Sequence, residues 1–243
     1  MKYMICGACG HMGRVLTQLI LERLPDTDII PVDAHPDCAD VYRSPADYAG
    51  KVDCVIDFSH HSATKAVTEY CAETCTPLVL GTTGQTAEEH AMILAASEHA
   101  PLFFAGNFSV GIAVLCRIAR QAVAAFPDAD IEIVETHHNR KLDVPSGTAL
   151  ALARAVQSQR PDSVLRVGRH EDGKRQKNEI DIHSLRMGSI VGRHEIHICT
   201  ETQTLTLTHE AHDRKLFAEG ALEAAAFLVG KPAGLYGMED LLG

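Results

Sequence analysis

The sequence predicts an α/β protein, with a Rossmann-type parallel sheet domain and a smaller α+β domain that holds a mixed, largely antiparallel sheet. Over residues 1–108, short apolar segments alternate with amphipathic ones, which is typical of a parallel sheet covered by helices on both faces. After residue 159, three strand-like segments follow one another without a helix between them. The final segment, 213–243, is expected to return to the first domain, so that the second domain spans 109–212.

The first domain alternates predicted strands with predicted helices. Apolar residues recur at helical spacing from Met12 to Leu24, and Thr86 and Glu89 form a capping box at the start of a later helix. Pro31 cannot donate a ladder hydrogen bond, so we expect its strand at an edge or in an irregular stretch. Residues 34–50 predict a loop with at most a short helix. The predicted strands are 2–6, 28–33, 52–58, 77–80 and 102–105, and the predicted helices are 12–24, 62–75 and 86–99.

The second domain begins with a long apolar helix and continues mainly in strands. Thr204, Thr206 and Thr208 alternate with Leu205 and Leu207, which is typical of an antiparallel strand with one buried face. The predicted strands are 130–136, 179–185, 193–200 and 202–208, and the predicted helices are 109–126, 146–159 and 213–229, the last of which leads back to the first domain.

Composition and charge exclude several classes of protein. The 243 residues carry 22 Lys and Arg against 32 Asp and Glu, a net charge of −10. Neither nucleic acid nor an anionic membrane surface is therefore an expected partner. No apolar run reaches the roughly 20 residues of a membrane helix, and the opening MKYMICGACG lacks the apolar stretch of a secretory signal. We expect a cytoplasmic protein whose eight cysteines are buried free thiols.

A glycine-rich turn, GACGHMG at residues 7–13, lies between the first predicted strand and helix. Its glycines permit a tight turn and the close approach of a pyrophosphate to the helix N-terminus. Asp33, at the end of the second strand, is placed to accept hydrogen bonds from an adenosine ribose. A dinucleotide site is favoured over a turn without a ligand. It is also favoured over a redox or metal pair of Cys6 and Cys9, because no second C-x-x-C exists.

The residues around the expected ribose site indicate the nucleotide. Asp33 would repel the 2′-phosphate of NADPH, and Ala34 supplies no cation to bind it. His35 and Arg43 are close enough in sequence to compensate. We therefore expect NADH to be used at least as well as NADPH.

Residues 135–149, ETHHNRKLDVPSGTA, carry the densest set of reactive groups. The chain leaves a strand with His137 and His138 and reaches Lys141 before Pro-Ser-Gly-Thr starts a helix. A serine there can cap the helix, and the next backbone N–H groups form a seat for an anion. A histidine beside a bound carboxylate can transfer a proton near neutral pH. The alternative is a basic loop that only caps a helix, but the clustering of these groups favours a site.

No metal site is expected. His137 and His138 are adjacent, so in a strand they point in opposite directions and cannot easily share one ion. His60 and His61 have the same spacing. The remaining pairs lack an obvious third ligand: His194 with His197, and His209 with His212.

In these segments the chain resembles the dihydrodipicolinate reductase family of the bacterial lysine and diaminopimelate pathway. The block HHNRKLDVPSGTA is specific, whereas the glycine turn alone would be weak. The matching blocks occur in family order over nearly the whole chain: GACGHMGR at 7–14, DFS at 57–59, GTTG at 81–84, AGNFSVGI at 105–112, ETHHNRKLDVPSGTA at 135–149, HSLRMGSIVGRHE at 183–195 and LTHEAHDRKLFAEGAL at 207–222.

The resemblance implies reduction of 4-hydroxy-tetrahydrodipicolinate by NADH or NADPH, with hydride transfer to the ring and loss of the 4-hydroxyl as water. It implies that His137 is the catalytic acid/base and that Lys141 donates a proton or stabilises developing charge. The cyclic dicarboxylate would be bound by His138, Ser146, Gly147 and Thr148. The cofactor would be bound by Gly7, Ala8, Cys9, Gly10, His11, Met12, Asp33, Gly81, Thr82, Thr83, Ala105, Gly106, Asn107 and Phe108. It further implies a homotetramer assembled through the sheets of the second domain.

The sequence departs from the family pattern in places, and other functions stay open. Ala34 stands where NADP-preferring members often carry Arg, Met187 replaces a small residue, and Arg193 replaces a frequent Glu. One alternative is a different two-domain dehydrogenase that acts on a small carboxylate. In that case, removal of Lys141 would have little effect on the dipicolinate-type reaction. A dinucleotide sensor would need the glycine turn but none of the groups in 135–149, and metal analysis would detect a zinc-binding protein.

Overall fold

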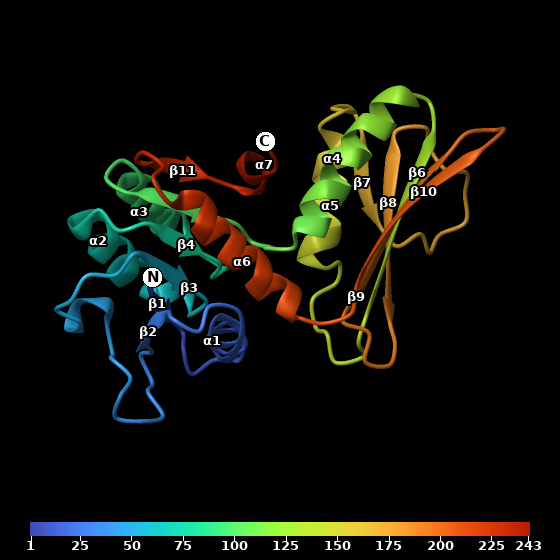
Figure 1. The fold of residues 1–243 in the computed structure, drawn as a ribbon. Coiled ribbons are helices and arrows are strands. Elements are labelled where there is room, and N and C mark those ends of the chain that lie inside the picture. Colours follow the sequence, from blue (N-terminus) through green and yellow to red (C-terminus); the bar gives the residue numbers. More distant parts are fainter. The chain divides into compact units, whose positions relative to one another are not determined.

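The computed structural model describes all 243 residues and divides them into two compact units. One unit contains Met1–Phe108 together with Lys215–Gly243, and the other contains Ser109–Arg214 (Figure 1). The chain therefore leaves the first unit after residue 108 and re-enters it at residue 215.

The first unit is built on a six-stranded parallel sheet in the order β11-β5-β4-β3-β1-β2. Its edge strand β2 contains Pro31, so the edge position predicted from that proline is confirmed. Beyond β2, the backbone of Tyr42 donates to Pro31 O at 3.0 Å. The strands are β1 Lys2–Cys6, β2 Asp28–Val32, β3 Cys54–Asp57, β4 Leu78–Leu80, β5 Pro101–Phe104 and β11 Gly234–Tyr236.

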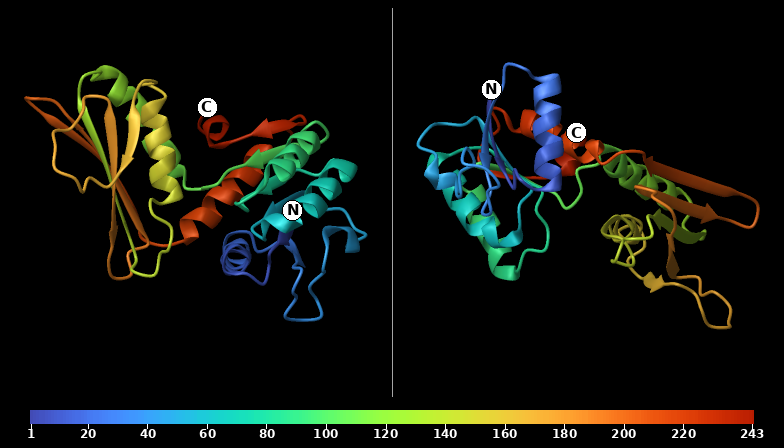
Figure 2. Two further views of the ribbon diagram at one scale, coloured as in Figure 1. Left: turned by 180° about the vertical axis from the view of Figure 1, so that it is seen from behind. Right: turned by 90° about the horizontal axis from the view of Figure 1, so that it is seen from below.

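Helices cover both faces of this sheet, as the sequence predicts (Figures 1 and 2). Alternate residues of β1 divide between two cores: Tyr3 and Ile5 pack with α1 and α6, whereas Met4 and Cys6 pack with α2 and α3. The helices are α1 His11–Arg23, α2 Thr64–Thr74, α3 Ala87–Ser97, α6 Lys215–Leu228 and α7 Met238–Leu242, with the 3-10 turns η1 Pro45–Asp47 and η2 His61–Ala63.

The second unit contains a five-stranded sheet in the order β10-β9-β6-β8-β7. The sheet is mixed, as predicted, with β6 and β7 parallel to β8, and with β9 antiparallel to both β6 and β10. Helices α4 Val110–Ala125 and α5 Gly147–Gln157 pack on one face over isoleucines of β6, β8 and β9. The strands are β6 Asp130–His137, β7 Val164–Val167, β8 Glu179–Arg186, β9 Gly192–Cys199 and β10 Thr204–Ala211.

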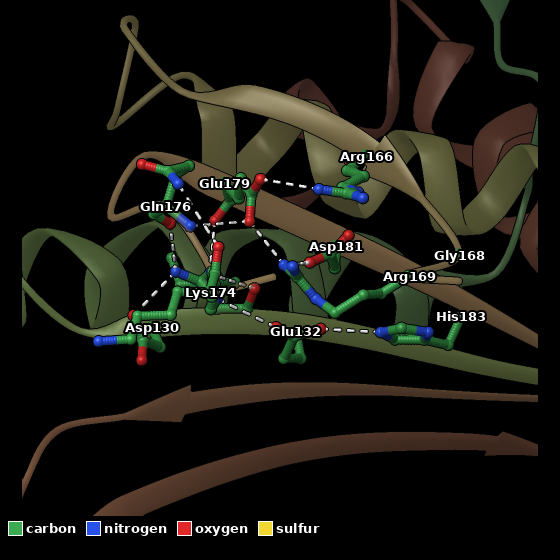
Figure 3. A network of polar contacts seen from close by, with 12 residues as sticks. Asp130, Glu132, Arg166, Gly168, Arg169, Lys174, Gln176, Glu179, Asp181 and His183 are labelled. Atoms are coloured by element: carbon green, nitrogen blue, oxygen red, sulfur yellow. Dashed lines mark hydrogen bonds and ion pairs between the residues drawn. The ribbon is translucent and has the colours of Figure 1, made fainter. Parts of the chain in front are cut away.

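An ion-pair network lies on the opposite face of this sheet (Figure 3). Arg175, in the loop between β7 and β8, pairs with Glu132 at 3.1 Å and with Asp130 at 2.8 Å, and also donates to the carbonyl of Ile131. His183 Nε2 lies 2.9 Å from the other oxygen of Glu132. These contacts hold the loop against the sheet and satisfy carboxylates on a face that α4 and α5 do not cover.

A second part of this network lies on β8. Arg169 bonds Glu179 at 2.5 Å and the fully buried Asp181 at 2.6 Å. Hydrogen bonds from Arg169 and from the backbone of Gln176 lower the pKa of Glu179 to about 2. Both carboxylates therefore have cationic partners.

Three short elements escape prediction from the sequence: β7, β11 and α7. Each lies at a sheet edge or near the chain's end and has few buried side chains, so each lacks a clear apolar period. The alternation in β10 is real, but Leu205 is exposed because β10 is itself an edge strand.

All eight cysteines are free, as expected, but their burial differs. Cys54 is buried, as its apolar run predicts, whereas Cys116 is half-buried. The expectation of burial is wrong for Cys38, Cys75 and Cys199, which are exposed because they lie outside the apolar runs. No helix in the protein is both long and apolar enough to cross a bilayer.

Candidate active site

The glycine turn at residues 7–13 has the geometry of a phosphate cradle. Gly7 has φ +78°, and a Cβ on Gly7 would collide with the carbonyl of Phe58. A Cβ on Gly13 would collide with the carbonyl of Gly7. Helix α1 starts immediately after Gly10 and has no side-chain cap there, so its first N–H groups face the turn. This close packing of the turn thus requires glycine at both positions, and the start of α1 offers hydrogen-bond donors for a pyrophosphate.

Asp33 follows β2, at the edge where the glycine turn lies. Its carboxylate accepts hydrogen bonds from Cys9 N at 3.0 Å and from His35 N at 2.9 Å. Asp37 accepts a 3.1 Å hydrogen bond from Cys9 Sγ and also pairs with Arg14. The loop after β2 is therefore held to the glycine turn by two carboxylates.

The residues predicted near the nicotinamide end follow β4 and β5. Thr82 Oγ1 donates to Asp57 at 2.5 Å, and Ser59 Oγ donates to the other oxygen of Asp57 at 2.5 Å. Asp57 is buried, and burial raises its pKa although these hydroxyls oppose the shift. Phe108 is buried, with its ring centroid 5.7 Å from that of Phe58.

The first unit therefore brings the predicted cofactor residues together. Four segments meet at the carboxyl ends of parallel strands, which is where open α/β sheets bind nucleotides. These residues fit a dinucleotide, because a Cβ at Gly7 or Gly13 would collide with nearby backbone atoms, so that only glycine forms the turn. The segments are 7–12 after β1, Asp33 after β2, 81–83 after β4 and 105–108 after β5.

In the second unit, one face of the sheet changes from apolar to polar along β6. Ile131 and Ile133 pack under the helices, and the same period of two places Glu135 and His137 on that face. The neighbouring strands change in step, because Glu135 lies opposite His194 of β9, and His137 lies opposite Arg186 of β8. A cluster of charged and titratable groups results at the end of the helix-covered face.

Glu135 is the centre of this cluster. Its side chain is fully buried, and its two oxygens accept both guanidinium nitrogens of Arg186 at 2.8 Å. His137 Nδ1 lies 2.5 Å from Oε2, and Ser146 N donates to Oε1 at 3.1 Å. Burial opposes ionisation of Glu135, but the hydrogen bonds from His137 and Arg186 outweigh it and hold its pKa far below the ordinary value.

Helix α5 begins beside this carboxylate. Ser146 caps the helix by accepting from Ala149 N at 3.1 Å, and its hydroxyl also lies 3.1 Å from His194 Nε2. Gly147 and Thr148 are the first two residues of α5, whose N–H groups have no acceptor within the helix. The backbone N–H and the hydroxyl of Ser146 therefore have partners inside the protein. The seat for an anion consists of Gly147 and Thr148, which follow it.

His194 is a neutral neighbour of His137. Burial and the nearby imidazole of His137 lower the pKa of His194 to about 3. The two rings meet edge to face, with centroids 5.1 Å apart. His194 therefore packs against His137 without adding a charge.

The predicted lysine and second histidine lie in the loop between β6 and α5. Lys141 Nζ pairs with Asp143 at 2.8 Å, and its side chain is 21% exposed. His138 Nε2 accepts a 3.3 Å hydrogen bond from Arg214. Burial and the charge of Arg140 lower the pKa of His138. The second unit thus places His137, His138 and Lys141 in one segment that leads directly to the α5 seat.

Sequence reasoning assigned no role to Glu135, Arg186, His194 or Asp57. Glu135 had a signal, because it continues the inward period of Ile131 and Ile133, where a carboxylate needs a buried partner. Its partner Arg186 is 51 residues away and gives no local signal. The structure contains no group of three or more His, Cys, Asp or Glu side chains that could hold a metal ion.

Family models match both parts of the chain. Residues 1–108 match the model described as dihydrodipicolinate reductase, N-terminus, and residues 111–242 match the model described as dihydrodipicolinate reductase, C-terminus. Together these matches cover nearly the whole sequence.

Curated relatives and a solved structure agree with these models. The chain is 42% identical over 258 residues to the 4-hydroxy-tetrahydrodipicolinate reductase of Anaeromyxobacter sp. (strain Fw109-5), with 98% of this chain and 96% of that protein covered. It is 38% identical over 249 residues to that of Alkaliphilus metalliredigens (strain QYMF), covering 100% and 99%. A dipicolinate-bound dihydrodipicolinate reductase from Paenisporosarcina sp. TG-14 has the same fold, with a TM-score of 0.80, 24% identity, and 99% and 98% coverage.

Proposed function

This chain belongs to the dihydrodipicolinate reductase family, and from that premise we propose how its residues reduce 4-hydroxy-tetrahydrodipicolinate to tetrahydrodipicolinate with NADH or NADPH. The first unit binds the nucleotide. The turn at 7–12 holds the pyrophosphate at the first N–H groups of α1, and Asp33 accepts from the adenosine ribose. When bound, the reduced nicotinamide supplies a hydride to the substrate ring. The residues at its nicotinamide end are Gly81, Thr82, Thr83, Ala105, Gly106, Asn107 and Phe108.

The second unit binds the substrate, which is a cyclic dicarboxylate. The N–H groups of Gly147 and Thr148 bind one carboxylate at the positive end of α5, and Ser146 shapes this seat by capping the helix. His138 binds the substrate beside it. These local donors overcome the net charge of −10, which would otherwise repel a dianion.

His137 is the acid/base and Lys141 stabilises charge. The Nδ1 atom of His137 faces Glu135, so proton transfer to or from the substrate uses Nε2. Lys141 exchanges part of its contact with Asp143 for the negative charge that develops on the substrate. Loss of the 4-hydroxyl as water accompanies hydride addition, and the protonated imidazole supplies the proton that this change requires.

One observation carries this proposal: a carboxylate-bound histidine, a lysine and the N-terminus of helix α5 lie in a single segment at one end of a sheet. A protein that only sensed a dinucleotide would not need them. The test follows loss of absorbance at the nicotinamide band, with the substrate generated in situ by the preceding synthase. Rapid loss that requires the synthase is expected, and binding of NADH without consumption would support a sensor instead.

The same assay, run with both nucleotides, tests the cofactor preference. Asp33 and Ala34 place a negative charge, and no cation, where the 2′-phosphate of NADPH would lie. We expect kcat/KM for NADH to equal or exceed that for NADPH. A strong preference for NADPH would show that His35 or Arg43 supplies a phosphate site.

The second unit is also proposed to join copies of the chain into a homotetramer through its sheet. The edge strand β10 exposes Thr204, Thr206 and Thr208, and this edge of the sheet would supply the contact between copies. Sedimentation velocity on the purified chain should show a species of four times the mass of one chain. A monomer at assay concentration would exclude this assembly.

A further inference from the structure

We propose that Glu135, clamped by Arg186, is a positioning residue that fixes the acid/base imidazole of His137 and the start of the α5 anion seat in one geometry. The inference rests on the proposed role of His137 in proton transfer. Glu135 itself does not contact the substrate. It acts through His137 and the start of α5, which do.

The four hydrogen bonds to Glu135 divide evenly between its oxygens. Oε2 receives one nitrogen of Arg186 at 2.8 Å and faces His137 Nδ1 at 2.5 Å. Oε1 receives the other nitrogen of Arg186 at 2.8 Å and Ser146 N at 3.1 Å. Arg186 thus holds the carboxylate in a bidentate clamp, and the remaining position on each oxygen holds one part of the site.

This geometry selects one tautomer of His137. An ionised carboxylate has no proton to donate, so the hydrogen between Glu135 and His137 resides on Nδ1. The nitrogen left for exchange with the substrate is Nε2. The backbone carbonyl of His137 also accepts from Met187 N at 2.9 Å, and the ring packs on Gly192, where a Cβ would lie 3.1 Å from Nε2.

The same carboxylate fixes the distance from the imidazole to the seat. Ser146 is the residue that caps α5, and its N–H is held by the oxygen that does not contact His137. Displacement of the carboxylate would therefore move the imidazole and the first turn of α5 relative to each other. Errors on this scale matter, because proton transfer depends on near-attack geometry.

The chain offers a matched control in Glu132. It lies three residues earlier on the same strand and also contacts an arginine and a histidine, Arg175 and His183. Its side chain is 31% exposed and belongs to the opposite face of the sheet. Glu132→Gln therefore repeats the chemical change without touching the proposed site.

The experiment compares Glu135→Gln, Glu132→Gln, His137→Gln and the double variant Glu135→Gln/His137→Gln in the coupled reductase assay. We expect Glu135→Gln to lower kcat by about 100-fold, the scale of a lost acid/base contribution, with a smaller change in KM. Glu132→Gln should keep the wild-type kcat. In the His137→Gln background the Glu135 substitution should have little further effect on kcat, because its effect passes through the imidazole.

A second readout does not depend on turnover. Histidine-ring ¹⁵N NMR should show the proton of His137 on Nδ1 in the wild type and in Glu132→Gln, and a loss of that preference in Glu135→Gln. An unchanged tautomer with unchanged kcat in Glu135→Gln overturns the inference. Independent, multiplicative losses in the double variant overturn it as well, because they indicate a purely structural carboxylate.

The design separates this inference from the proposed function. Wild-type turnover of His137→Gln would refute the acid/base role, whereas the tautomer measurement would still test what Glu135 does to the ring. If Glu135→Gln does not fold, Glu135→Asp keeps the charge and withdraws it by one methylene. That variant should fold and lose kcat with a shifted pH profile, and a wild-type pH profile and kcat would overturn the inference.

Discussion

Two glutamates of strand β6, Glu132 and Glu135, face opposite sides of the second unit's sheet and have partners of the same types. Each contacts one arginine and one histidine. They differ in burial, because the side chain of Glu132 is 31% exposed and that of Glu135 is fully buried. The first network holds a loop against the sheet (Figure 3), and the second holds the proposed acid/base.

The comparison shows what burial adds to an ion pair. Water can replace any partner that Glu132 loses, so its contacts are worth little individually and its geometry can vary. Glu135 has no access to water, so the loss of a partner leaves a buried, uncompensated charge. The sequence uses the same residue types twice, but only the buried set is rigid enough to position a reacting group.

Removal of the clamp on the buried side should have the largest effect on stability. Arg186→Met leaves Glu135 with no cationic clamp and should lower the free energy of unfolding by about 3–5 kcal/mol. Arg193→Met breaks the exposed pair of Arg193 with Glu195 and should cost less than about 1 kcal/mol. Urea denaturation of both variants measures the two values. Equal losses would remove the distinction between the two faces.

Lys141 should separate activity from stability. Its pair with Asp143 is partly exposed, so Lys141→Ala should change the free energy of unfolding little. Loss of its charge beside the substrate should cost about 3–4 kcal/mol of transition-state stabilisation, measured as a fall in kcat/KM. Near-wild-type turnover would refute the role of Lys141.

Gly192 tests how closely the buried face fits the imidazole. A Cβ at this position would lie 3.1 Å from His137 Nε2, so Gly192→Ala should displace the ring and reduce kcat by about tenfold. Overpacking should destabilise the protein by about 1–3 kcal/mol. Gly234→Ala is the control, because its nearest contacts are atoms of Tyr236 at an ordinary 3.5 Å. A wild-type kcat for Gly192→Ala would show that the ring tolerates movement.

The smallest expected effect is on the pH dependence of stability. It compares Glu135 with Asp57, a buried carboxylate that has no cationic partner. Burial raises the pKa of Asp57 from 3.8, so its stabilising contribution is present below pH 3.8 and is lost as pH rises through the native pKa. Glu135 behaves in the opposite way, since burial is outweighed by hydrogen bonds and its pKa falls. Its contribution is complete above pH 4.5 and is lost as pH falls toward the native pKa.

Unfolding free energies measured against pH check these signs. The stability of Asp57→Asn relative to the wild type should rise as pH increases above 3.8, by at most about 1.4 kcal/mol per pH unit. The deficit of Glu135→Gln relative to the wild type should shrink as pH falls below 4.5. Curves that run parallel to the wild type would contradict both assignments.

Local patterns made much of the fold predictable from the sequence. The strand–turn–helix at residues 2–23 and the capping box of Thr86 with Glu89 depend on residues a few positions apart, and the structure confirms both. Pro31 predicted an edge strand because a missing N–H is a local property. The edge elements β7 and β11 were missed because short strands are defined by their neighbours in the sheet.

The candidate site was predictable only where its groups are consecutive. The segment from His137 to Thr148 is contiguous, so its residues could be identified together. The clamp of Arg186 on Glu135 depends on the parallel register of β6 with β8, and no turn fixes that register along the chain. The contact of Asp33 with Cys9 N likewise requires the folded turn.

The break in the first unit has a consequence for biosynthesis. Helix α6 supplies Ala218, Ala221 and Leu228 to a core that also contains Leu16, Leu19 and Phe103. In the sequence, the whole second unit lies between these two groups of residues. On the ribosome, the continuous second unit can fold while the α6 side of the first sheet is still uncovered. The nascent chain must therefore keep that apolar surface from aggregating until residue 228 has emerged, and truncation within α6 would leave it permanently open.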